Sequence, residues 1–358
     1  MTTKISSIVA EQLLPQKGGD SEKEHQLSEI KIAPYLNKLL ERASSQPSEP
    51  LGKILASNEA REYIAKFSFF QNLAWEVVDA RINNDYQRIM SFATNAISDG
   101  SGLHMNPQLS IPKHQKMTNI HRMPGGYLSD SGNQDILAGL RYLNYISLFS
   151  KNSPFDSFSD NLVPRIKEKF IQNKFPKLNP KRVIDLGCGI GHNTISLKNL
   201  YPHARVIGVD LGGAMLRYGY ATAKLLNQEV EFYQQNADYT EFPNQQFDLV
   251  TSFLLLHEIP KTSMKRVMSE CARLLRPGGV MIHFDSGMFL DPQTPQAKVI
   301  RDIQALYNNE IFIVSPPLST IEKMIEDSGM EPIIAKIGDE NSLNNGLKRW
   351  QIVAGVRL

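Results

Sequence analysis

The run RVIDL at residues 182–186 leads directly into a turn with glycine at positions 187, 189 and 191. A short apolar run bounded by glycines is typical of a buried strand. Glycine lets backbone N–H groups approach a bound nucleotide closely, and the N-terminal end of a following helix attracts negative charge to the same point. The pattern therefore predicts a strand, a ligand-binding turn and a helix, in that order.

An acidic residue ends the next apolar run, RVIGVD at residues 205–210. That residue, Asp210, follows the glycines by about 20 residues, where an acid is placed to accept hydrogen bonds from both hydroxyls of a ribose. A second acid, Asp185, lies within the first strand. We therefore expect the turn to bind an adenosine-containing cofactor.

From residue 181 onward, apolar runs alternate with amphipathic segments, which is typical of a parallel sheet with crossover helices. The last two apolar runs are separated by a glycine-containing segment without a helix, so we expect the last strand to be antiparallel. The chain thus predicts an α/β fold with a seven-stranded, mostly parallel sheet. We place its strands at 182–186, 205–209, 230–233, 247–252, 279–284, 332–337 and 349–356, and its helices near 192–200, 213–226, 261–275 and 318–328.

The chain before this sheet is predicted to be mostly helical. Apolar residues from Tyr63 to Ile89 recur three to five positions apart, as in an amphipathic helix, with a break expected near Asn83. Such a stripe is typical of a core or of a dimer interface, so we expect either burial or a homodimer formed through these helices. We divide the chain into a flexible segment at 1–50, a helical N-terminal domain or lid at 51–155 and the α/β domain at 156–358.

Charge and cysteine usage bear on the expected partners and cellular compartment of the protein. The chain has 39 basic and 37 acidic residues, too balanced to favour a nucleic-acid partner without a local basic patch. The two cysteines, Cys188 and Cys271, suit a reducing compartment, and no spacing of metal ligands is present, so we expect no metal. Because no long apolar run or signal-like start occurs, we expect a cytoplasmic protein that does not enter the membrane.

Five sequence motifs occur in the order and spacing of a known family. They are DLGCGIG at 185–191, Asp210, NAD at 236–238, FDLVTSF at 247–253 and LLRPGGV at 274–280. Together they resemble the class I S-adenosylmethionine-dependent methyltransferases, from Pro180 to the end of the chain. The resemblance implies a Rossmann-like sheet with an antiparallel hairpin at its end, and S-adenosyl-L-methionine as the cofactor.

The resemblance also implies which residues hold that cofactor. The first motif would bind its methionine end, Asp210 its ribose and the third motif its adenine, with the strand at 247–253 lining the site. The cofactor-binding positions are then Asp185, Gly187, Cys188, Gly189, Asp210, Leu211, Met215, Ala237, Asp238, Tyr239 and Phe253.

His257 is the first candidate for a catalytic residue. It follows the strand at 247–252 at the carboxyl edge of the sheet, where open α/β sheets bind ligands, and a histidine there is suited to accept a proton. The alternative is that His257 caps the next helix or packs against the cofactor. Glu258 would orient His257 or face solvent, and Asp285 is a further catalytic candidate. His283 lies two residues before Asp285 on the same side of its strand and is a substrate-binding candidate.

A segment rich in turn-forming residues precedes the sheet and contains His121, Arg122 and Tyr127. Loops with this composition often act as lids over binding sites, so these three residues are candidates for substrate contact. The alternative is a surface connection without ligand contact. Composition does not decide between the two.

We therefore expect a methyltransferase that acts on a small molecule with an apolar or aromatic part. Two alternatives stay open. The helical N-terminal part would recognise a protein or an RNA, or the chain would bind the cofactor without transferring a methyl group.

Overall fold

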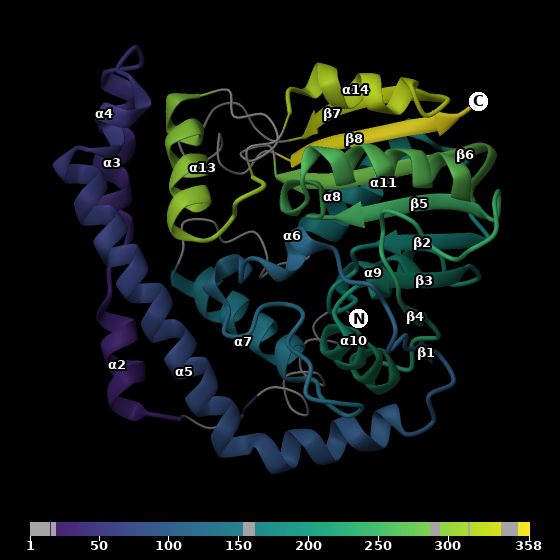
Figure 1. The fold of residues 1–358 in the computed structure, drawn as a ribbon, viewed down its shortest axis with the longest axis horizontal. Helices are drawn as coiled ribbons and strands as arrows, with labels where there is room; N and C mark the ends of the chain where they lie inside the picture. Colours follow the sequence, from purple (N-terminus) through teal and green to yellow (C-terminus); the bar gives the residue numbers. More distant parts are fainter. Residues whose placement is uncertain (1–14, 16–18, 153–161, 287–293, 314–315, 338–349) are drawn as a thin grey trace.

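The computed structural model describes residues 15, 19–152, 162–286, 294–313, 316–337 and 350–358. Its centre is an eight-stranded sheet in the order β1-β4-β3-β2-β5-β6-β8-β7 (Figure 1). The strands are β1 (Leu103–His104), β2 (Arg182–Leu186), β3 (Arg205–Asp210), β4 (Glu231–Gln234), β5 (Phe247–Phe253), β6 (Leu275–Ser286), β7 (Met330–Ile337) and β8 (Trp350–Arg357).

The sheet has the predicted topology with one added strand. Strands β1 to β6 pair in parallel, whereas β8 is antiparallel to both of its neighbours, β6 and β7. The Rossmann-like fold with an antiparallel last strand is thus confirmed. The seven-strand prediction omits β1, a two-residue strand that extends the edge beside β4 and carries no sequence pattern of its own.

The central strand β2 is buried on both faces, as its continuous apolar run predicts. Ile184 and Leu186 pack in one cluster with helices α11 (Lys261–Leu274) and α14 (Leu318–Glu326). Val183 packs in another cluster with α8 (Leu162–Lys174), α9 (His192–Leu200) and α10 (Gly213–Leu225). Because successive side chains of a strand point to opposite faces, one short run fills two layers of core.

The N-terminal half is helical and packs beside the sheet domain, as Figure 1 shows. A 40-residue helix, α5, bends part-way along its length, and α2, α3 and α4 pack against it. Helices α5 and α7 both contact α10, and α13 contacts α3. The bounds are α2 (Ser21–Glu29), α3 (Ala33–Ser45), α4 (Leu51–Leu55), α5 (Asn58–Ile97), α6 (Lys113–Lys116), α7 (Leu137–Asn152) and α13 (Pro295–Tyr307).

Three expectations for the helical part need correction. Residues 21–45 contain α2 and α3, and Leu36 and Leu39 are buried. The prediction of a flexible segment at 1–50 was therefore wrong for these residues. Residues 1–14 and 16–18 lie outside the described chain. Helix α5 bends but is not broken near Asn83. Helix α13 was not predicted at all.

The aromatic stripe of α5 lies inside the molecule. Tyr63, Phe67 and Phe70 are buried in one cluster with Met215 and Tyr218 of α10. The stripe therefore forms core, and a dimer through these helices would have to use other residues. No helix in the described parts of the chain is long and apolar enough to cross a membrane.

Two adjacent phenylalanines test this packing. Phe70 is fully buried, whereas Phe69 is 46% exposed. Because truncation of a buried phenylalanine removes apolar burial and leaves a cavity, Phe70→Ala should lower the free energy of unfolding by about 3–5 kcal/mol. Urea unfolding followed by circular dichroism measures this. Phe69→Ala is the matched control, and equal losses in both variants would contradict the packing.

Candidate functional site

The glycine turn after β2 forms one half of the site. Gly187, Gly189 and Gly191 all have positive φ angles, of 65°, 53° and 74°, which side chains rarely adopt. The turn is closed by Asp210 at the end of β3, because Oδ2 of Asp210 accepts a hydrogen bond of 2.8 Å from the backbone N–H of Gly189. Oδ1 accepts another of 2.8 Å from the N–H of Gly212. The carboxyl ends of two neighbouring strands are thereby fixed together.

Asp210 keeps capacity for further hydrogen bonds. A carboxylate offers about four acceptor positions, and two are used by these N–H groups. Burial raises the pKa of Asp210, although the N–H groups of Gly212 and Gly189 oppose the shift. A ligand with hydroxyl donors would satisfy the positions that remain.

Asp185 stabilises the glycine turn through buried hydrogen bonds. Its Oδ1 accepts a hydrogen bond of 2.6 Å from Asn193, and its Oδ2 accepts one of 2.7 Å from the hydroxyl of Thr194. Asp185 is fully buried and joins β2 to the first turn of α9. Cys188 is also buried, and burial raises the pKa of its thiol. Both residues therefore shape the turn, and direct ligand contact by them stays a prediction.

The remaining predicted cofactor residues lie around this turn. Met215 is buried in α10, and a Cβ built on Gly189 would lie 3.7 Å from its Cε. Asp238 uses Oδ2 to accept hydrogen bonds from Ser263 and Arg266. Tyr239 is 72% exposed. Leu211 and Ala237 are partly buried beside the ends of β3 and β4, and Phe253 is partly buried at the end of β5.

His257 lies in a short 3-10 helix, η2 (Leu256–Glu258), directly after β5. Its Nδ1 donates a hydrogen bond of 2.6 Å to Oδ1 of Asp285 at the end of β6. The other oxygen of Asp285 accepts hydrogen bonds from the backbone N–H groups of Leu256 and His257. Asp285 therefore fixes both the ring and the backbone of His257, and acts as a positioning residue.

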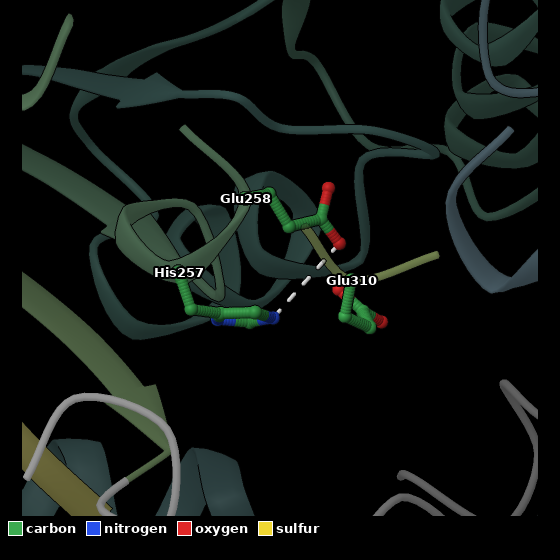
Figure 2. A group of neighbouring side chains, drawn as sticks. All are labelled: His257, Glu258 and Glu310. Atoms are coloured by element: carbon green, nitrogen blue, oxygen red, sulfur yellow. Dashed lines mark ion pairs between the residues drawn. The ribbon is translucent and has the colours of Figure 1, made fainter. Parts of the chain in front are cut away.

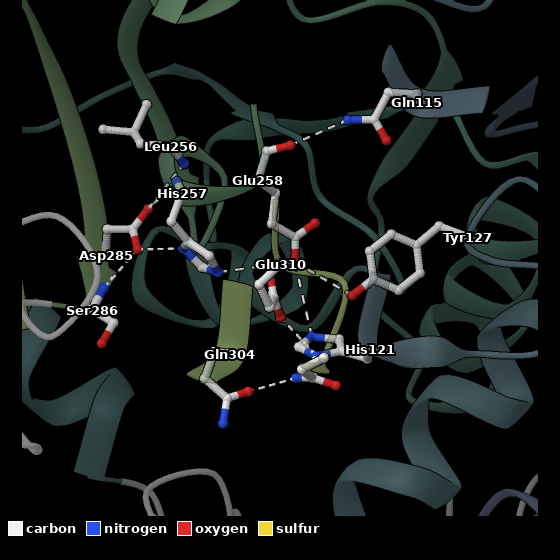
Figure 3. Close-up of polar contacts among 11 residues, drawn as sticks. Gln115, His121, Tyr127, Leu256, His257, Glu258, Asp285, Ser286, Gln304 and Glu310 are labelled. Carbon is white, nitrogen blue, oxygen red and sulfur yellow. Dashed lines mark hydrogen bonds and ion pairs between the residues drawn. The ribbon is translucent and has the colours of Figure 1, made fainter. Parts of the chain in front are cut away.

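The second nitrogen of His257 faces a group of buried polar side chains (Figure 3). Nε2 lies 4.0 Å from Oε1 of Glu258, which accepts a hydrogen bond of 3.3 Å from the hydroxyl of Tyr127. Nε2 of His121 also lies 4.0 Å from Oε1 of Glu258, and its Nδ1 lies 2.7 Å from Oε1 of Glu310. We call His121, His257, Glu258 and Glu310 the polar cluster.

Burial and mutual charge shift the pKa values of the polar cluster. Burial alone would lower the pKa of His257, but Asp285, Glu310 and Glu258 raise it to about 9. Burial and the charge of Glu310 raise the pKa of Glu258 to about 7. Burial opposes ionisation of Glu310, yet His121 and His257 lower its pKa. Such perturbed groups are typical of functional sites.

Tyr127 and Tyr142 connect the polar cluster to the glycine turn. The carbonyl oxygen of Tyr127 lies over Gly212, where a Cβ would come within 2.6 Å of it. Burial raises the pKa of the Tyr142 hydroxyl, and the charges of Glu258, Glu310 and Asp210 raise it further. The hydroxyl of Tyr127 bonds to Glu258 while its carbonyl lies beside Gly212, and a Cβ on Gly187 would lie 2.7 Å from Leu255, directly before η2. The two halves therefore lie side by side.

Two predicted substrate residues are not brought into this site. His283 is fully buried, with Nδ1 2.6 Å from the hydroxyl of Ser252 and Nε2 3.7 Å from the thiol of Cys271. The histidine therefore faces α11, and the prediction that it contacts substrate was wrong. The described contacts of Arg122 include no side-chain bond to the polar cluster, whereas those of His121 and Tyr127 do.

Sequence analysis missed Glu310 and Tyr142. Glu310 follows the unpredicted helix α13, and Tyr142 lies on α7 among ordinary helical apolar residues. No spacing signals their approach to His257. The expectation of no metal rested on spacing alone, yet His257, Glu258 and Glu310 form a group that could hold a metal ion, with ligand atoms within 4.8 Å of one another (Figure 2).

Comparison with known proteins finds similarity in the part of the sheet domain that runs from β2 to the start of β6. Residues 183–279 match the family model described as a methyltransferase domain. A demethylmenaquinone methyltransferase of Thermus thermophilus is 32% identical over 103 residues, which cover 29% of this chain and 46% of that protein. A tRNA N(3)-methylcytidine methyltransferase of Drosophila melanogaster is 28% identical over 119 residues, 31% of this chain and 36% of that protein.

A ubiquinone/menaquinone biosynthesis C-methyltransferase of Hahella chejuensis is 25% identical over 188 residues, 47% of this chain and 74% of that protein. The chain thus spans less than half of the length of the first two relatives. Among solved structures, the YcgJ protein of a Bacillus species is similar with a TM-score of 0.45 and 17% identity, over 54% of this chain and 98% of that one.

Asp210 provides a direct test of the glycine turn. Removing a charged acceptor of two hydroxyl hydrogen bonds costs about 1.5–3 kcal/mol, so Asp210→Ala should weaken binding of S-adenosylmethionine about 10- to 150-fold. Isothermal calorimetry measures the affinity. Asp210→Asn keeps one acceptor oxygen, so its affinity for S-adenosylmethionine should fall less. Asp327→Ala removes an acid that is 47% exposed and serves as the control. Unchanged affinity in Asp210→Ala would refute the role.

Proposed function

We propose that the chain, whose residues 183–279 match a methyltransferase domain, transfers a methyl group from S-adenosylmethionine to a small-molecule acceptor. The main support is one juxtaposition. The turn closed by Asp210 adjoins the buried polar cluster around His257. A nucleotide-binding turn next to perturbed ionisable groups is the arrangement that group transfer requires.

The residues of the turn fit the cofactor. A Cβ on Gly187 would lie 2.7 Å from Leu255 and one on Gly191 would lie 2.6 Å from Phe232, so only glycine lets the turn adopt this shape. Asp210 retains acceptor positions for ribose hydroxyls. When bound, S-adenosylmethionine supplies a methyl group on a sulfonium, and transfer leaves the bonding electrons on sulfur. The protein then has chiefly to align the acceptor, which forms the new bond with its own lone pair.

His257 is the residue that we propose activates the acceptor. Asp285 holds Nδ1, so Nε2 points toward Glu258 and Glu310 rather than toward the sheet. A hydroxyl or acidic carbon acceptor must lose a proton. Because the pKa of His257 is about 9, Nε2 accepts it in the minor neutral form of the imidazole, whose share grows as the pH rises toward 9. Glu258 and Tyr127 would orient the acceptor from the opposite side.

A small acceptor suits the enclosure of this site. His257 is 3% exposed and Glu310 2% exposed, and Tyr127 and His121 lie across Glu258. A protein or RNA substrate would require these segments to move apart. Two relatives are named for quinone methylation. Tyr127 and Tyr142 form a T-shaped pair with ring centroids 5.6 Å apart, which is compatible with an aromatic acceptor.

The activity itself is tested with a metabolite extract and cofactor carrying an isotopically labelled methyl group. Mass spectrometry should detect one extract component that gains the label, and this component identifies the acceptor class. A label that appears on protein or RNA instead would support the macromolecular alternative. Cofactor binding with no labelled product from any extract would support a binding protein without methyl transfer.

Substitution of His257 tests its role once the acceptor is known. Because an acid–base group is typically worth about 100- to 10,000-fold, His257→Ala should lower kcat by that factor and leave cofactor affinity nearly unchanged. His203 is exposed, and His203→Ala is the matched control. A normal rate would remove the role, and loss of cofactor binding would favour the packing alternative.

A further inference from the structure

Glu310 is a buried acid with one close charged partner. Its side chain is 1% exposed, and Oε1 lies 2.7 Å from Nδ1 of His121, an ion pair that lowers the pKa of Glu310. Oε2 has no hydrogen-bond partner among the described residues. A carboxylate buried in this way is costly unless a cation or donors compensate for it.

His121 is poorly placed to supply that compensation by itself. Nδ2 of Asn308 lies 3.1 Å from the same Nδ1, and it also donates a hydrogen bond of 2.7 Å to Oε1 of Gln304. The side-chain oxygen of Asn308 accepts from Gln71, which fixes the amide in this orientation. Nδ1 of His121 therefore has two competing partners, Glu310 and the amide of Asn308, so His121 compensates the charge of Glu310 only in part.

Three ligand atoms meet at this point from two parts of the chain. They belong to His257, Glu258 and Glu310 and lie within 4.8 Å of one another, and Figure 2 shows all three side chains directed toward a common space. In a tetrahedral site with bonds of about 2.1 Å, ligand atoms lie about 3.4 Å apart. The 4.0 Å between Nε2 of His257 and Oε1 of Glu258 is longer than this, so the three side chains must move closer together to bind one cation.

The surroundings of His257 suit a metal ligand. A histidine that binds a metal usually donates its other ring N–H to a carboxylate, which fixes the tautomer and ring orientation. Nδ1 of His257 makes this bond to Asp285 at 2.6 Å, and the backbone N–H groups of Leu256 and His257 hold the same carboxylate. Nε2 is then the nitrogen directed toward Glu258 and Glu310.

We propose that His257, Glu258 and Glu310 bind one divalent transition-metal cation beside the glycine turn. One imidazole and two carboxylates suit zinc, manganese or iron(II) better than magnesium or calcium, which prefer oxygen ligands alone. Three protein ligands leave coordination positions open, as in catalytic metal sites. The cation replaces the protons that the cluster otherwise needs to balance its charge.

The role of the cation rests on the proposed function, whereas its binding does not. With a cation on Nε2, His257 would serve as a ligand instead of the base proposed above, and the acceptor would bind the cation through a hydroxyl or enol oxygen. The O–H bond would break with the electron pair left on oxygen, and a water molecule that enters with the acceptor would carry the proton to solvent. The inference thus narrows the acceptor to molecules that present an oxygen at the reacting position.

Cobalt(II) is the probe for the site, because its visible d–d absorption reports the coordination geometry. Full-length protein is treated with a chelator, dialysed and titrated with Co²⁺. One equivalent should bind with visible bands, and Zn²⁺ should displace it, whereas Mg²⁺ at equal concentration should not. X-ray absorption of the cobalt complex should detect one imidazole. Failure of the wild-type protein to bind one equivalent of Co²⁺ refutes the proposal, and so does a cobalt coordination shell without imidazole.

Variants locate the bound cation. Glu310→Gln and Glu258→Gln should each weaken Co²⁺ binding by at least about tenfold, and Asp285→Asn, which perturbs the support of His257, by about 10- to 100-fold. Glu326 is exposed on α14, and Glu326→Gln is the matched control. Circular dichroism and melting curves check that each variant folds. Unchanged affinity in both folded glutamate variants refutes the site.

Calorimetry with S-adenosylmethionine separates this inference from the proposed function. Methyl transfer that persists undiminished in protein freed of metal refutes the catalytic role of the cation, while the methyltransferase proposal stands and the Co²⁺ titration decides the binding site. Stoichiometric Co²⁺ binding lost in Glu310→Gln, together with no cofactor binding, supports the cation site and refutes the methyltransferase proposal.

Discussion

The hydrogen bonds that Asp210 accepts from Gly189 and Gly212 fix the geometry on which the site depends. They join the ends of β2 and β3, which are neighbours in the sheet. The turn reaches this position because its glycines adopt left-handed backbone angles. Asp185 secures the same turn from within through Asn193 and Thr194. The glycine turn therefore presents a rigid backbone to a ligand, with its polar groups already oriented.

The polar cluster depends on a different constraint, the cost of burying ionisable groups. Its histidines and glutamates come from η1 (Ile120–Arg122), η2 and the segment after α13, and they are largely excluded from water. Each ionised group is stabilised by another, so the pKa values shift together. Such a network is held in one arrangement only while all of its supporting segments stay packed.

The helical half of the chain supplies part of that packing. The ring of Tyr142 on α7 packs against the ring of Tyr127, and α13 leads into Glu310. Helix α10 shares a core with α5 and α7 through Tyr218. The helices therefore both cover one side of the sheet domain and contribute to its site. The predicted domain boundary at residues 155 and 156 stays a prediction, since a single hydrophobic cluster crosses it.

The sequence by itself determined the sheet, the glycine turn and the positions of Asp210 and His257, because local apolar patterns and glycine angles act over a few residues. It also offered His121 and Tyr127 as candidates for substrate contact, and that contact stays a prediction. Only the tertiary structure brought Glu310 to His257, separated His283 from the site and extended the sheet by β1. These outcomes depend on contacts between residues far apart in the chain, and burial decides them after the elements have packed.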